Sequence, residues 1–153
     1  MQLSDVFVGL GQENLAQLLR EVSLGKLKTY QLFDRVKTRL HLAKLNQEHL
    51  RKCAPKLWER LGAKDEELAS DLSQAVLVSH LDMLVAVLDL LEIPHNEGFF
   101  DKDAEIAAKL TTGWQERVYG AFQDRFPKAV LVFYVNHLAH EVAGATEVYR
   151  PAQ

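Results

Sequence analysis

The spacing of hydrophobic residues along the chain is that of α-helices. Between Gln12 and Val22, and again between Thr29 and Ala43, apolar side chains recur every three or four residues, on one face of a helix. No run of residues alternates strictly between apolar and polar, as a half-buried strand would. The eight glycines and four prolines fall mostly where helices should end. This pattern predicts an all-α protein of about five to seven helices.

Two segments are apolar on nearly every side, and we expect them to be central helices. Residues 65–91 begin with three acids, which favour the start of a helix, and continue with little polar surface. Residues 128–145 follow Pro127, and their first two turns are almost wholly apolar. Residues 1–153 are therefore expected to form one domain, an irregular helical bundle whose tail frays from about residue 146.

Other signals predict where shorter elements begin and end. Pro55 is best placed in the first turn of a helix, so residues 55–61 are expected to form a short helix of their own. Residues 104–126 should be helical with a disturbance at 111–113. In the loop 93–101, Phe99 and Phe100 are expected to tuck against the core.

Composition and charge then narrow the classes of function. The apolar content of 48% and net charge of −3 are ordinary for a globular protein. The chain starts without a basic signal region, contains no long apolar span and has a single cysteine, so we expect a cytoplasmic protein that does not enter a membrane. Catalytic sequence motifs are not found, which favours a non-enzymatic protein.

The distribution of charge is the most unusual global feature. Residues 26–64 hold eleven Lys or Arg against three Asp or Glu, whereas residues 65–105 hold one Lys against eleven acids. A basic surface beside Trp58 suits a phosphate backbone or an acidic protein partner, although the two blocks can also neutralise each other when their helices pack. The candidate residues for such binding are Lys52, Lys56, Arg60, Lys64, Arg35 and Arg39. Three acids of the second block, Asp71, Asp82 and Asp89, are expected to form a solvent-facing edge.

The last helix carries a polar cluster that could hold a metal ion. His137 and Glu141 are four residues apart and share a helical face, with His140 beside them. Imidazole and carboxylate groups on one face can bind a divalent metal, and His80 is a candidate third ligand from the central helix. Asn136 also belongs to this polar cluster, for which a solvent-facing stripe and a buried hydrogen-bond network are the alternatives.

The order of a mid-chain histidine followed by a His-rich last helix resembles the DinB-like helical bundles. That resemblance implies a four-helix bundle with a three-histidine metal site. It covers only residues 136–141, and Glu141 stands where the family has its second histidine of the pair.

Three functions follow in order of preference. The first is a non-enzymatic helical module that binds an acidic protein partner or associates with itself, selected by its charge asymmetry. The second is a metal-binding helical bundle, either catalytic or not, that uses a divalent metal on the last helix. The third is a nucleic-acid-binding domain that uses the basic residues 26–64.

Overall fold

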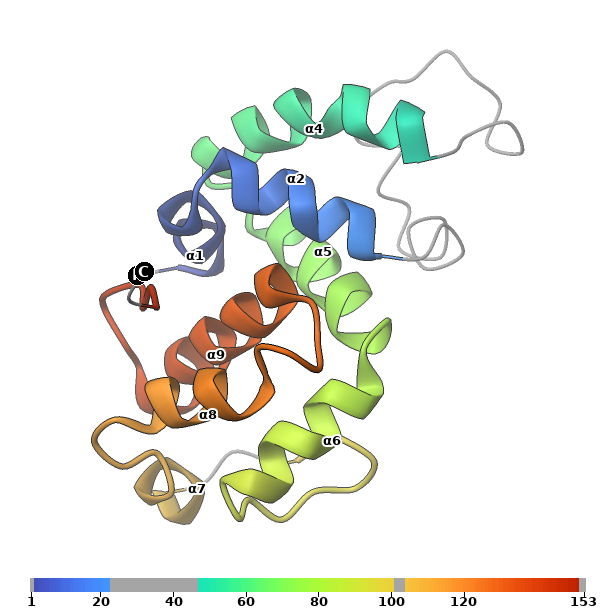
Figure 1. The fold of residues 1–153 in the computed structure, drawn as a ribbon. Helices are drawn as coiled ribbons and strands as arrows, with labels where there is room; N and C mark the ends of the chain where they lie inside the picture. Colours follow the sequence, from blue (N-terminus) through green and yellow to red (C-terminus); the bar gives the residue numbers. More distant parts are fainter. Residues whose placement is uncertain (1, 23–46, 101–103, 152–153) are drawn as a thin grey trace. The chain divides into compact units, whose positions relative to one another are not determined.

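The computed structural model describes residues 2–22, 47–100 and 104–151, which form helices and no strand. Its helices are α1 (Leu3–Leu10), α2 (Gln12–Glu21), α4 (Gln47–Gly62), α5 (Glu66–Val78), α6 (Leu81–Leu90), α7 (Ala104–Ala108), α8 (Trp114–Phe122) and α9 (Lys128–Ala143) (Figure 1). The all-α prediction is confirmed. The helix expected over residues 29–43 lies outside the described residues. The chain separates into two compact units, residues 2–79 and residues 80–153, so the single-domain prediction stays a prediction.

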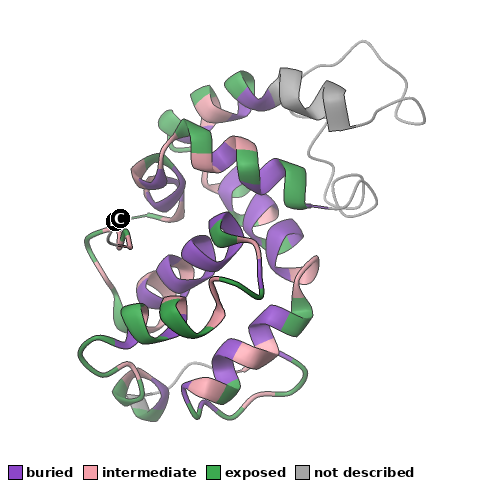
Figure 2. Ribbon diagram, viewed as in Figure 1, coloured by how far each residue is buried: buried purple, intermediate pink, exposed green. Residues whose placement is uncertain are grey.

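In the described part of the first unit, the helices α1, α2, α4 and α5 pack on one another. Each contributes an apolar stripe to the interior, and Figure 2 shows these buried stripes. The start of α1 is held by a capping box between Gln2 and Asp5. The Glu66 carboxylate accepts the backbone N–H of Ser4 at 3.1 Å, which ties the start of α5 to the start of α1.

Helix α4 corrects the prediction for Pro55. The residue does not begin a helix of its own but lies inside a continuous helix from Gln47 to Gly62. Pro55 is exposed, while Ala54, Leu57 and Leu61 are buried. Because those three residues pack in the contact of α4 with its neighbours, tertiary packing outweighs the backbone hydrogen bond that proline removes.

The apolar segment 65–91 forms two helices rather than one. The helix is interrupted at Ser79 and His80, the two residues between α5 and α6. The hydroxyl of Ser79 donates to the carbonyl of Ala75 at 2.7 Å, an interaction that often bends helices. In the part of the chain that the structure describes, no single helix is long and apolar enough to span a membrane; only this bent pair has the combined length and composition.

The second unit contains α6, α7, α8 and α9, and α9 is its most buried helix. Its buried residues include every position from Ala129 to Asn136, and both α7 and α8 contact it. The break expected at residues 111–113 is present, where Gly113 adopts a left-handed conformation (φ 82°) before α8. The buried Trp114 follows directly, as expected for a core aromatic residue.

A single side chain of α9 anchors the C-terminal tail. Asn136 accepts the backbone N–H of Tyr149 at 2.7 Å and donates to the carbonyl oxygens of Tyr149 and Val132, both at 2.9 Å. Residues 144–151 form no helix, yet Tyr149 is held in place through these bonds. Asn136 therefore belongs to a buried hydrogen-bond network, one of the alternatives considered for the polar cluster of this helix.

Candidate functional site: an acidic-rimmed groove along α6

Helix α6 has two different apolar faces. Met83, Leu84, Val87 and Leu88 are buried, as a core-facing stripe should be. The other face consists of residues 82, 85, 86, 89 and 90, whose spacing forms a second stripe along the same helix. Its apolar members are half-buried and its two aspartates are exposed. Apolar side chains thus lie on both sides of α6, and only one side is fully covered.

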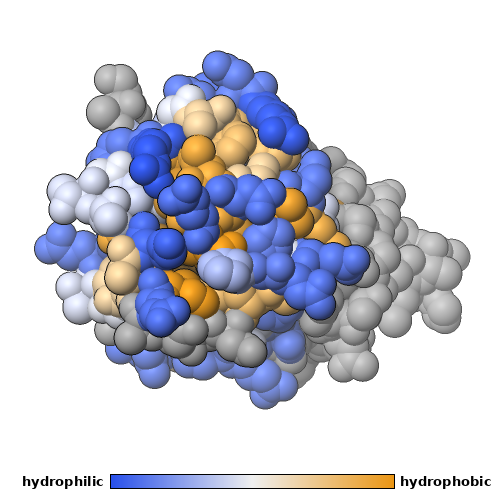
Figure 3. All heavy atoms as spheres, turned by 90° about the horizontal axis from the view of Figure 1, so that it is seen from below, coloured by the Kyte–Doolittle hydropathy of each residue, from blue (hydrophilic) through white to orange (hydrophobic). Residues whose placement is uncertain are grey.

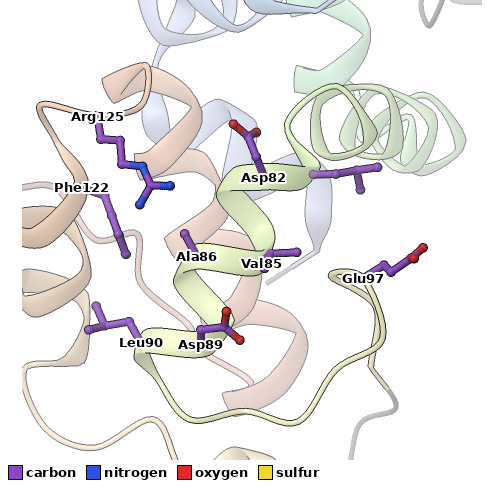
Figure 4. A pocket seen from close by; sticks show the side chains of 9 residues that line it. Asp82, Val85, Ala86, Asp89, Leu90, Glu97, Phe122 and Arg125 are labelled. Atoms are coloured by element: carbon purple, nitrogen blue, oxygen red, sulfur yellow. The ribbon is translucent and has the colours of Figure 1, made fainter.

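The uncovered face forms one wall of an open groove of about 840 Å³, whose lining side chains are drawn in Figure 4. The groove is lined by Leu81, Asp82, Val85, Ala86, Asp89, Leu90, Glu97, Phe122 and Arg125. Figure 3 shows hydrophobic side chains gathered among hydrophilic ones on one face of the molecule. Leu81 lines this groove and is 40% exposed.

A tight turn places Glu97 at the groove. Asn96 and Phe99 pair through two backbone hydrogen bonds of 2.7 and 3.0 Å, and Glu97 and Gly98 between them have positive φ angles of 53° and 95°. A Cβ on Gly98 would lie 3.3 Å from Cβ of Leu84. Glycine therefore allows both the turn and its close approach to α6.

His95 fastens this turn to α6. The backbone N–H of Gly98 donates to Nδ1 of His95 at 3.0 Å, so the ring proton belongs on Nε2. Nε2 lies 2.8 Å from Oδ1 of Asp89 and donates to that carboxylate. The side chain of His95 is 12% exposed, whereas that of Asp89 is 67% exposed. The histidine thus acts as a structural link and leaves the second carboxylate oxygen of Asp89 facing solvent.

The opposite end of the groove is aromatic and carries one cation. The guanidinium of Arg125 lies over the ring of Phe126, 4.9 Å from its centroid, and 6.0 Å from that of Phe122. Figure 4 shows the side chains of Arg125 and Phe122 directed toward α6. The groove lining contains three carboxylates, those of Asp82, Asp89 and Glu97, and one guanidinium, so the groove has an apolar floor and a net negative rim.

Phe99 corrects the expectation that it tucks against the core. Its side chain is 55% exposed and that of Phe100 is half-buried, whereas Ile93 at the start of the loop is buried. In this two-residue turn Gly98 is the residue that lies against Leu84 of α6, and the side chain of the next residue, Phe99, is exposed. Phe99 and Leu81 are two of the three large hydrophobic side chains that are exposed among the described residues.

The expected acidic edge is present only in part. Asp82 and Asp89 are exposed on α6, whereas Asp71 is half-buried on α5, beyond the bend. In the sequence, these acids share a helical phase with Val85, Ala86 and Leu90, a signal that marks the α6 wall of the groove but not its other walls.

The candidate metal ligands are not brought together as a set of three. Among the described residues, no group of three or more His, Cys, Asp or Glu is arranged to hold a metal ion. The ring of His137 stacks on Tyr134, with centroids 6.5 Å apart, and lies 5.9 Å from that of Phe133. His140 and Glu141 are half-buried near the end of α9, and His80 precedes α6. Metal binding by these four residues stays a prediction.

The basic candidates are described only in part. Lys56 is exposed on α4, Lys64 is exposed just beyond its end, and Arg60 forms an ion pair of 2.7 Å with Asp65. That pair joins the end of the basic block to the start of the acidic block. The side chain of Lys52, as well as Arg35 and Arg39, lies outside the described residues. Phosphate binding through this set stays a prediction.

Two tyrosines of the second unit have shifted pKa values. Burial raises the pKa of Tyr134 on α9 far above its ordinary value of 10.0. Burial also raises the pKa of Tyr149, and the nearby Glu116 carboxylate and Tyr119 raise it further. Neither tyrosine lines the α6 groove. Both are therefore neutral at physiological pH and have a structural part in this unit.

Comparison with known proteins does not suggest a function, so the functional proposal depends on the groove. No protein-family model matches the sequence. No curated protein is significantly similar to the chain, and no solved structure matches its fold with significance.

Proposed function

We propose that the protein is a non-enzymatic helical interaction module whose α6 groove binds a helix bearing apolar and basic side chains. The supporting observation is the second apolar stripe of α6, which is uncovered and edged by carboxylates. A groove of this kind matches the helix-in-groove mode of recognition, in which apolar anchors of the ligand helix recur at i, i+3 or i+4, and i+7.

The charges of the rim determine which helix fits. Asp82, Asp89 and Glu97 attract Lys and Arg on the flanks of a ligand and repel an acidic helix. Arg125 is stacked on aromatic rings at one end, so a ligand helix meets mainly carboxylates along α6. The sequence analysis favoured an acidic partner for the basic block, whereas the groove favours a basic partner for the acidic block.

The test is a titration of the protein into a labelled helical peptide of about 18 residues, with leucines on one face and lysines on its flanks. Fluorescence anisotropy should report saturable binding that weakens as salt rises, because the carboxylates are exposed and screened. The same peptide with glutamates in place of the lysines should not bind. Equal binding of both peptides, or of neither, would refute the proposal.

A matched pair of variants locates the binding site. Leu81→Asp removes an apolar side chain from the groove and should weaken binding by about tenfold or more, since a buried leucine contributes about 1.5–3 kcal/mol. Val8→Asp alters an equally exposed hydrophobic residue, 37% against 40%, that does not line the groove. Val8→Asp should leave the affinity unchanged. Equal losses in both variants would place the peptide elsewhere.

A further inference from the structure

The chain contains a segment with the chemistry that the groove selects. Residues 26–46 hold six Lys or Arg against one acid, Asp34. Within them, Phe33, Val36, Leu40 and Ala43 are spaced as the apolar anchors of one helical face. This pattern is a sequence-based expectation, because residues 23–46 lie outside the described part of the structure. The segment nevertheless combines apolar anchors with flanking cations, the two properties that the α6 groove requires.

The lengths also agree. Helix α6 has 10 residues, which corresponds to about 15 Å of helix. The apolar anchors from Phe33 to Ala43 would span about the same distance if that segment were helical. Four anchors over three turns therefore match the floor of the groove, while Arg35 and Arg39 fall at positions beside the anchors, where they can meet carboxylates of the rim.

We propose that the groove binds the 29–43 segment of a second copy of this chain. This inference rests on the proposed function and names the ligand helix. The contact is heterologous, because the groove of one copy receives a different surface of the next. In a pair of copies, one copy still has an empty groove and the other still has an unbound segment. Association therefore continues into longer chains or closes into a ring.

Two charge-reversal variants test the pairing in the full-length protein. The groove variant carries Asp82→Lys and Glu97→Lys, and it leaves Asp89 in place because that residue holds His95. The segment variant carries Arg35→Glu and Arg39→Glu. Size-exclusion chromatography with light scattering and sedimentation velocity should show concentration-dependent association of the wild type that weakens in high salt. Each variant alone should associate at least about tenfold more weakly.

Mixing the two variants provides the decisive measurement. The intact segment of the groove variant can enter the intact groove of the segment variant, and no further site remains. The mixture should therefore form a 1:1 complex that does not grow. A third variant, Lys109→Glu with Lys128→Glu, reverses two exposed cations that belong to neither the groove nor the segment and should associate like the wild type. Circular dichroism and thermal unfolding confirm that each variant folds.

Three outcomes would overturn this inference. They are a wild type that stays monomeric at all concentrations in low salt, variants that remain separate when mixed, and a Lys109/Lys128 control that loses association as fully as the segment variant. If the basic peptide still binds the groove in any of these cases, the proposed function stands and only the identity of the ligand is wrong. If the peptide does not bind, the proposed function itself fails.

Discussion

Helices α6 and α9 have similar apolar compositions but are buried differently. In α9, every side chain from Ala129 to Asn136 is buried, and α7 and α8 contact the helix. In α6, four residues are buried and a second apolar stripe lines a groove. The difference shows that apolar content predicts that a helix joins the core, while its neighbours decide how much of its surface stays accessible.

The polar residues of the two helices differ in the same way. Asn136 of α9 is 3% exposed and forms three hydrogen bonds. Asp82 and Asp89 of α6 are exposed and border the groove. A buried polar group must find partners inside the protein, whereas an exposed carboxylate can attract a cation from outside. We therefore interpret α9 as structural and α6 as the helix that meets a partner.

The largest expected effect is the loss of stability on truncating α9. Phe133→Ala removes a fully buried ring and should lower the free energy of unfolding by about 3–5 kcal/mol. The matched substitution on the groove face of α6, Val85→Ala, should cost less than about 1 kcal/mol because Val85 is only half-buried. Urea unfolding followed by circular dichroism measures both. Similar losses would mean that the groove face is part of the core.

A smaller effect is expected from the anchor of the tail. Asn136→Ala removes all three hydrogen bonds of that side chain and should cost about 1–3 kcal/mol. It should also expose the Tyr149 amide to hydrogen exchange. His140→Ala, at a half-buried position on the same helix, serves as the control and should keep the Tyr149 amide protected. Protection that persists in Asn136→Ala would show that other contacts hold the tail.

The smallest expected effect appears at alkaline pH. Tyr134 has its pKa raised by burial, so folding favours its neutral form. The resulting stability is fully present below the unfolded pKa of about 10 and falls as pH rises above it, by at most about 1.4 kcal/mol per pH unit. Tyr134→Phe should make the decline between pH 9 and pH 11 shallower, as measured by denaturant unfolding. An identical decline in both proteins would contradict the assignment to Tyr134, leaving groups such as Tyr149 responsible.

The ends of helices were predicted well where glycine, threonine or proline interrupts the hydrophobic pattern. Gly113 and the threonines before it mark the break before α8, and Pro127 directly precedes α9. The pattern was less informative at Pro55 and at residues 79–80. Packing of Ala54, Leu57 and Leu61 keeps α4 continuous, while the apolar sequence continues across the break between α5 and α6. Neither result depends on local propensity alone.

The candidate site was predicted only in fragments. The acids of α6 were recognised as an exposed edge, and the loop after α6 as a mixture of polar and aromatic groups. The groove could not be predicted, because Glu97 reaches α6 through the turn at Gly98 and Phe122 comes from a helix far along the chain. Such convergence depends on long-range packing, which leaves no periodic signal in one sequence.

By itself, the sequence determined that this protein is helical, because hydrophobic spacing, caps and helix-ending residues act within a few positions of one another. It also determined the separation of basic and acidic blocks, which is a property of composition. Only the tertiary structure decided that α9 is enclosed while one face of α6 stays open, since burial depends on neighbours that are distant in the chain.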